Sequence, residues 1–166
     1  MVHQARTPVC EHTKPQGINI PNRVWEHATA EEAAYISRVH KKRSRIRAKM
    51  AVMRLDGKDW QHIRPMSQED YRLSADINGF RQTLRHRRSQ SFTDGMYTVT
   101  RKSCYARIPE GRYGINDYQR CKKGDILLFS HVDELGRVFF VTSDSKMVAF
   151  KGCEVDGISR VASFED

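Results

Sequence analysis

The sequence predicts an α+β protein in which a basic helical segment is followed by a small antiparallel β-barrel. Up to about residue 90, apolar residues recur with the period of a helix, whereas from residue 91 they form short runs rich in β-branched and aromatic residues. Charge changes at the same point: residues 1–90 hold 18 Lys and Arg against 9 Asp and Glu, and residues 91–166 hold 11 of each. We therefore expect three parts: an extended arm over 1–28, the helical segment over 29–90 and the barrel over 91–166.

The composition is sufficient for a folded protein. With 166 residues, of which 39% are hydrophobic, the chain can form one ordinary domain or two small ones. No apolar run has the length of a membrane span, and the first residues lack the apolar stretch of a secretory signal. We expect the protein in the cytoplasm, or associated with a nucleoid or nucleus, and we expect no membrane partner.

The cysteine pattern indicates neither disulfides nor a metal centre. The four cysteines form no Cys-x-x-Cys pair, so reduced, separately buried thiols are expected. The alternative is a zinc site formed by Cys10 and His12, with His3 as a further ligand, but a second ligand pair is missing. We expect no cofactor.

Residues 1–28 are predicted to form an arm without a core of its own. Three prolines and Gly17 interrupt the segment, and no apolar period is sustained. Four apolar side chains in its second half are expected to dock on the rest of the protein, because burial of a tryptophan removes a large apolar area from water. These four are Ile18, Ile20, Val24 and Trp25.

A helix is predicted from Thr29 to about Leu55. Thr29 and Glu32 have the spacing of a capping box, and neither Gly nor Pro follows before Gly57. At 100° per residue one face is apolar and an adjacent stripe is cationic. The apolar face comprises Tyr35, Ile36, Val39, Ile46, Met50 and Met53, and the stripe comprises Arg38, Lys42, Arg45 and Lys49.

Residues 56–90 are predicted to form a turn, a short helix and a longer helix. Asp56-Gly57 is a stop signal, residues 59–63 can form one helical turn, and Pro65 precedes a second capping box at Ser67. Gly79 is expected to kink or split the longer helix. This outline resembles a helix-turn-helix without the glycine of its turn. The expected core stripe is Leu73, Ile77, Phe80 and Leu84.

Six short strands are predicted beyond residue 91. Their approximate ranges are 96–100, 104–108, 125–129, 137–141, 146–150 and 157–161. The stretches 123–129 and 135–141 resemble the strand, loop and strand of SH3-like barrels of the KOW and Tudor kind. That resemblance covers roughly the last 70 residues and implies a module that binds nucleic acid or peptide. It does not extend to the first 90 residues.

The clearest candidate site is a run of seven cations in twelve residues, none of them interleaved with an acid. Lys and Arg neutralise phosphates and release condensed counterions, whereas a merely solvated helix face usually carries acids one turn away. The alternatives are such a solvated face and an acidic protein partner. The seven are Arg38, Lys41, Lys42, Arg43, Arg45, Arg47 and Lys49.

Further candidate residues occur in two other places. A second cationic cluster, at the end of the longer helix, can contact phosphates or can complement the helix dipole. Cations and a tyrosine in expected barrel loops can follow a nucleic-acid backbone and stack on bases. The cluster comprises Arg81, Arg85, Arg87 and Arg88, and the loop residues are Arg112, Tyr113, Lys122 and Lys123.

The sequence predicts a non-catalytic protein that binds nucleic acid, DNA in preference to RNA. Transcription regulation or an architectural role would fit. One alternative is a small, possibly viral, effector that docks on an acidic protein surface. The other is a metal-dependent nuclease using Asp125, Asp144 and Lys146, in which carboxylates hold the ion and the lysine helps to position water. Against the nuclease, residues 143–146 also suit a tight turn between strands.

Overall fold

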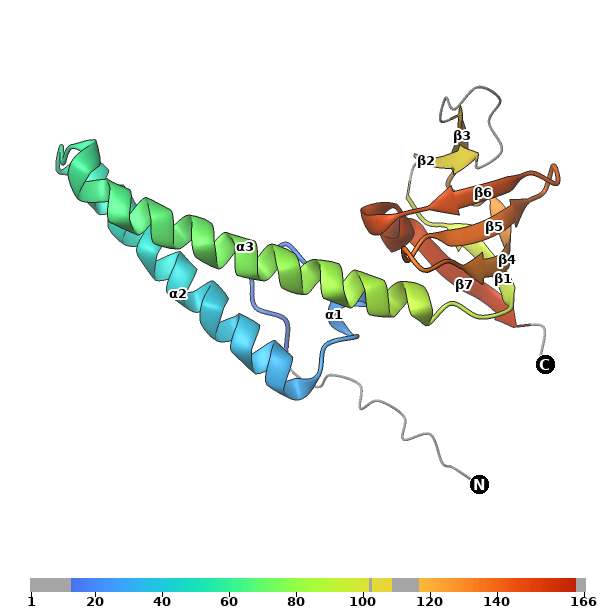
Figure 1. The fold of residues 1–166 in the computed structure, drawn as a ribbon, viewed down its shortest axis with the longest axis horizontal. Helices are drawn as coiled ribbons and strands as arrows, with labels where there is room; N and C mark the ends of the chain where they lie inside the picture. The colour runs from blue at the N-terminus through green and yellow to red at the C-terminus, as the bar shows by residue number, and fades with distance from the viewer. Residues whose placement is uncertain (1–12, 102, 109–116, 164–166) are drawn as a thin grey trace. The chain divides into compact units, whose positions relative to one another are not determined.

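The computed structural model describes residues 13–101, 103–108 and 117–163 of an α+β protein. Helices occupy the first half of the chain and an antiparallel sheet occupies the second (Figure 1). The chain divides into two compact units, Met1–Leu84 and Arg85–Asp166, which we call the helical unit and the sheet unit. Among the described residues, none of the helices is both long and apolar enough to cross a membrane.

A hairpin of two long helices forms the helical unit (Figure 1). After the short α1 (Asn22–Trp25), α2 (Ala30–Leu55) begins at the predicted cap, where the Thr29 hydroxyl accepts from the Glu32 amide. The helix ends at Leu55 with Asp56 as its C-cap, and Gly57 adopts a φ of 72°, a left-handed conformation that glycine allows at helix ends. The predicted limits of this helix are confirmed.

The next helix is continuous, which corrects two predictions. Helix α3 (Trp60–Gln90) runs through both Pro65 and Gly79, so the short helix, break and helix of a helix-turn-helix are absent from this stretch. Pro65 lies in the second turn, where the missing N–H removes a single hydrogen bond near the helix start. Burial of Ile63 before it and Leu73 after it holds both sides of the proline in one helix.

One apolar core joins the arm to the hairpin. Ile20 and Val24 are fully buried with Ile36 of α2 and Leu84 of α3. The ring of Trp25 packs edge-on against Phe80, with 6.1 Å between centroids. The predicted docking of the arm and the predicted core stripe of α3 are therefore confirmed. Tyr35, predicted on the packing face, is instead half exposed at its edge.

Seven antiparallel strands form the sheet unit, in the order β3-β2-β6-β5-β4-β1-β7. All six predicted strands are present, and the additional strand is β3, whose polar sequence resembles a loop. Among the described residues no backbone pairing joins the two edges, β3 and β7. A short 3₁₀ helix, η2 (Gly152–Gly157), precedes the last strand. The strands are β1 (Gly95–Val99), β2 (Ser103–Ile108), β3 (Asp117–Lys122), β4 (Ile126–Val132), β5 (Val138–Thr142), β6 (Met147–Phe150) and β7 (Ile158–Ser163).

An aromatic cluster lies at the centre of the sheet unit. Phe140 is fully buried, and its ring contacts those of Phe92, Tyr97, Phe129 and Phe150 at centroid distances of 5.5–6.1 Å. All seven strands contribute a side chain to the surrounding core. One face of the whole sheet therefore packs on a single core.

Candidate nucleic-acid interface

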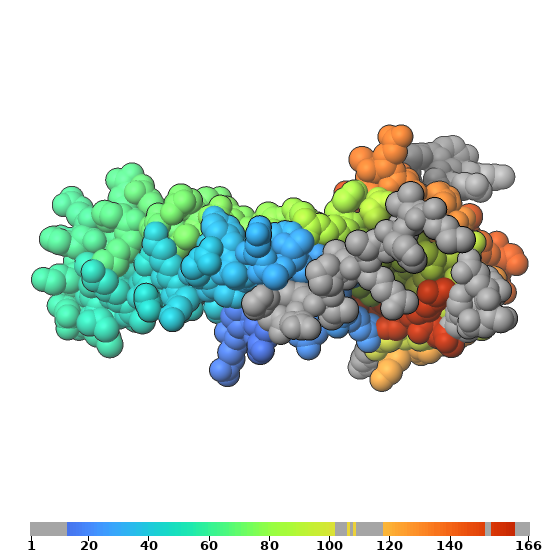
Figure 2. All heavy atoms as spheres, turned by 90° about the horizontal axis from the view of Figure 1, so that it is seen from below, coloured from blue at the N-terminus to red at the C-terminus, as the bar shows by residue number. Residues whose placement is uncertain are grey.

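Four cations lie on the side of α2 that points away from the core. Arg38, Lys41, Arg45 and Lys49 are exposed, and none of them has an ion pair or side-chain hydrogen bond to another described residue. Spacings of three, four and four residues align them along about 16 Å of helix. Figure 2 shows atoms of α2 (cyan) at the surface of the helical unit. We call these four residues the outer stripe.

The other three cations of the predicted run are paired with acids of α3. Lys42 reaches Glu69 at 2.9 Å, and Arg43 and Arg47 share Oδ1 of Asp70 at 3.1 and 2.8 Å. The sequence shows no acid within this part of α2, but the antiparallel partner helix supplies two. Thus fewer cations are free of an acidic partner than the sequence suggests.

These pairs lower the pKa values of both acids. Hydrogen bonds from Arg72 and Lys42 to Glu69 lower its pKa to about 2. Burial raises the pKa of Asp70, but Arg47 and Arg43 outweigh that effect and the net pKa is lowered. Both carboxylates therefore favour the folded helical unit when they are ionised.

We expect the stabilising effect of Glu69 to depend on pH. A lowered pKa means that the stabilisation is complete above the ordinary glutamate value near 4.5 and is lost as the pH falls towards 2. The gap in melting temperature between wild type and Glu69→Gln should be small at pH 7, because the pair is exposed, and should close by pH 2. Fluorescence of buried Trp25 would report the unfolding. Glu134→Gln, an exposed change in the sheet unit, is the control, and a gap that stays constant with pH would contradict the prediction.

Two cations of the second predicted cluster hold the sheet unit together. Arg88 is buried and donates to the carbonyl oxygens of Val155 and Ile158, the second at 2.7 Å. Arg85 donates to the buried carboxylate of Asp156 at 2.9 Å. We therefore remove Arg85 and Arg88 from the predicted phosphate-binding set, because their donors are used within the fold.

The other two members of that cluster have different surroundings. Arg81 belongs to the helical unit, where it donates to the carbonyl of Asn19 at 3.2 Å and to the Asn78 side chain at 2.8 Å. Arg87 is partly buried in the sheet unit and has an interaction of its own. Neither belongs to the outer stripe.

The candidates in the second half of the chain are only partly described. Arg112 and Tyr113 lie outside the described residues, as do His3, Cys10 and His12 of the suggested zinc site. Lys122, at the end of β3, and Lys123, in the following turn, are exposed. Of the four predicted loop residues, the structure therefore describes only these two lysines.

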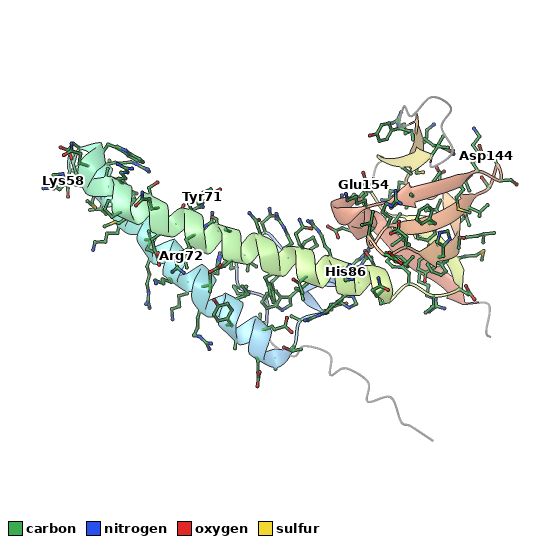
Figure 3. All side chains as sticks on the ribbon, in the orientation of Figure 1. Lys58, Tyr71, Arg72, His86, Asp144 and Glu154 are labelled. Carbon is green, nitrogen blue, oxygen red and sulfur yellow. The ribbon has the colours of Figure 1, made fainter. Side chains whose placement is uncertain are left out.

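The proposed nuclease carboxylates serve as turn residues. Asp125 accepts from the Lys122 amide at 2.8 Å, and Asp144 accepts from the Thr142 hydroxyl in the turn between β5 and β6 (Figure 3). The predicted turn at 143–146 is confirmed by the hydrogen bond from the Thr142 amide to the Lys146 carbonyl. In the described part of the chain, no three His, Cys, Asp or Glu side chains gather as a metal site.

No family model, curated protein or solved structure matches this chain. We therefore infer its function from the arrangement of its own residues.

An exposed apolar patch at the far end of the helical hairpin was missed from the sequence. Leu55 is 87% exposed, and Val52 and Trp60 are each more than half exposed. Lys58 lies in the turn between them (Figure 3). The sequence signal for this patch was an apolar run that continues to the turn at Asp56. At that end of the hairpin no other described element covers these side chains. We call Val52, Leu55, Lys58 and Trp60 the hairpin tip.

Proposed function

We propose that this protein is a non-catalytic nucleic-acid-binding protein, with DNA preferred over RNA, whose outer stripe contacts the phosphate backbone. The observation that carries the proposal is a row of four exposed cations without acidic partners among the described residues. Cations in this state need give up no internal ion pair to bind a phosphate. Such a role would place the protein in the cytoplasm, or with a nucleoid or nucleus.

The hairpin tip supports contact with unpaired bases as well. Trp60, two residues after Lys58 in the sequence, is more than half exposed, and stacking of a base on an aromatic side chain contributes about 1–3 kcal/mol. The outer stripe and the tip both lie on the helical unit. Single strands therefore belong in any binding test beside duplex DNA.

We further propose that the sheet unit is an SH3-like module of the KOW and Tudor kind, which would add a second binding surface. Two features support the resemblance. Strands β7-β1-β4-β5-β6 follow the order of a small barrel sheet, with a 3₁₀ helix before the last strand. A single core includes Cys121 of β3 and Ile158 of β7, as expected if the sheet curls on itself. Exposed Lys122 and Lys123 are the cations on this module that we assign to nucleic acid.

The test is a salt series with random duplex DNA, single-stranded DNA and RNA. For duplex DNA, the logarithm of the binding constant falls with the logarithm of salt concentration by about 0.9 per phosphate contact. Replacing all four residues of the outer stripe with alanine should therefore reduce the slope by roughly 3 to 4. Binding to all three nucleic acids should weaken, because the stripe reads no base.

A matched control removes four cations that are already paired. It consists of alanine at Lys42, Arg72, Arg137 and Lys146, which pair with Glu69, Asp133 and Asp144. This variant has the same net charge as the stripe variant but should keep most of the wild-type slope. An equal reduction of the salt slope in the two variants would show that binding depends on net charge alone and not on the outer stripe. No binding of nucleic acid by the wild type at low salt would overturn the proposal.

The second candidate function is docking on an acidic protein surface, which the hairpin tip favours. Exposed Leu55 and Val52 next to cations resemble the apolar centre and charged rim of a protein interface. In that case the wild type would not bind bare nucleic acid. Leu55→Asp would then abolish binding to the partner protein. Binding to that partner would also be less sensitive to salt than binding to phosphates is.

A further inference from the structure

A polar cavity lies between the arm and the two long helices of the helical unit. Its volume is about 330 Å³, at the lower end of the range of roughly 300–1,000 Å³ for small-molecule sites. Gly17 to Asn19 of the arm, one side of α2 and one side of α3 line it. We call it the arm cavity.

The lining of the arm cavity is basic. His40, Arg43, Arg47 and Arg81 contribute to it, and no Asp or Glu among the described residues lines it. The groove near Tyr35 and Arg38 differs, because its lining includes Asp76 and two cations that are already paired with Glu69. In the described part of this unit, cationic side chains therefore converge on the arm cavity without an acid in its wall.

One buried donor at the arm cavity has no partner among the described residues. Nε of Arg81 is buried and forms no hydrogen bond in the structure. His40 donates through Nε2 to the Gln16 carbonyl at 3.1 Å, so its other ring nitrogen, Nδ1, which is also buried without a partner, is not counted as a donor. Leaving a buried donor unpaired is unfavourable, so Nε of Arg81 points to an absent acceptor.

The two arginines of α2 retain capacity for an anion as well. Arg43 and Arg47 each use Nε on the same oxygen of Asp70, and the structure shows no partner for their terminal Nη groups among the described residues. One aspartate therefore balances two guanidinium groups. With Arg81, the cavity has a surplus of positive charge.

We propose that the arm cavity binds a phosphate group, either as free phosphate or as a phosphomonoester. Planar guanidinium groups bind phosphate oxygens through paired N–H donors, and three of them approach the cavity from two helices. Ser74 and Asn78 of α3 add polar side chains to the wall. The volume exceeds that of a phosphate ion, so the group can carry an ester substituent, including the end of a nucleic-acid strand.

The first test uses inorganic phosphate and the full-length protein at constant ionic strength, with chloride as the reference anion. Phosphate should raise the melting temperature read by Trp25 fluorescence and should shift the Nε–H resonances of Arg43, Arg47 and Arg81 in a nitrogen–proton NMR spectrum. Ser74→Asp places a carboxylate in the wall and should weaken phosphate binding roughly tenfold or more. Ala75→Asp, on the adjacent exposed position, is the matched control and should bind normally.

Three outcomes would overturn the proposal: no effect of phosphate beyond that of chloride, equal effects of the two aspartate variants, or NMR shifts confined to the outer stripe. The wild-type spectrum decides the matter even if Ser74→Asp does not fold. Oligonucleotides with a 5′-phosphate or a 5′-hydroxyl then identify the source, because only the first would compete with free phosphate for the cavity. Phosphate binding is measured without nucleic acid, so the two proposals are tested independently. The phosphate site can be disproved while the outer stripe still binds DNA, and DNA binding can be disproved while the cavity still binds phosphate.

Discussion

Replacing Phe140 with alanine is expected to destabilise the sheet unit by about 3–5 kcal/mol. The side chain is fully buried, and four other aromatic rings contact it at centroid distances of 5.5–6.1 Å. Truncation removes the transfer free energy of the ring and leaves a cavity among aromatic residues of β1, β4 and β6 and of the segment before β1. A unit of this size has a total stability of roughly 4–12 kcal/mol, so the loss takes up much of it.

Hydrogen exchange measured by mass spectrometry is the appropriate readout for Phe140→Ala. Both tryptophans, Trp25 and Trp60, lie in the helical unit, so their fluorescence does not report on the sheet directly. Peptides from β1, β4, β5 and β6 should exchange faster together. Tyr118→Ala removes a half-exposed aromatic side chain of β3 and should change little. Comparable exchange in the two variants would show that Phe140 is not the centre of the core.

Elements whose partners are close in sequence were predictable. The helix from Thr29 to Leu55 follows from a cap, a stop and an apolar period, all of which operate within a few residues. The six predicted strands follow from runs of β-branched and aromatic residues. In contrast, β3 has a polar sequence and is stabilised by its ladder with β2, from Ser103 opposite Lys122 to Ile108 opposite Asp117. Pairing of that kind is a tertiary interaction that local pattern does not show.

The candidate site likewise has features that local sequence predicts and features that depend on tertiary packing. The exposed face of α2 follows from helical period, so the positions of Arg38, Arg45 and Lys49 on it could be predicted. The pairing of Lys42 with Glu69, 27 residues away, depends on the antiparallel packing of α3. The continuity of α3 through Pro65 depends on the same packing, because burial on both sides of the proline outweighs the lost hydrogen bond. Sequence reasoning therefore located the basic region but overestimated its free cations.

Replacing Asp156 with alanine is expected to destabilise the sheet unit by about 3–5 kcal/mol, because it removes the acid of a buried ion pair. The Asp156 side chain is 2% exposed and that of Arg85 is 13% exposed, with 2.9 Å between Nη2 and Oδ2. Arg101 lies farther from the same carboxylate oxygen, at 3.8 Å, and its side chain is half exposed, so water can solvate its charge when Asp156 is lost. The variant would leave the charge of Arg85 buried and unbalanced.

A double-mutant cycle separates the ion pair from the effect of truncation. If Arg85 and Asp156 act on each other, the double alanine variant should be more stable than the sum of the single losses implies, with a coupling in the range of 0.5–3 kcal/mol. Lys146→Ala, which breaks the exposed pair with Asp144 at 3.6 Å, is the reference for a weak pair. Exchange in the peptide that contains η2 gives the readout. Strong coupling would establish that Arg85 stabilises the fold. Coupling near zero would make Arg85 again a candidate for phosphate contact, and the proposed interface would then extend beyond the outer stripe.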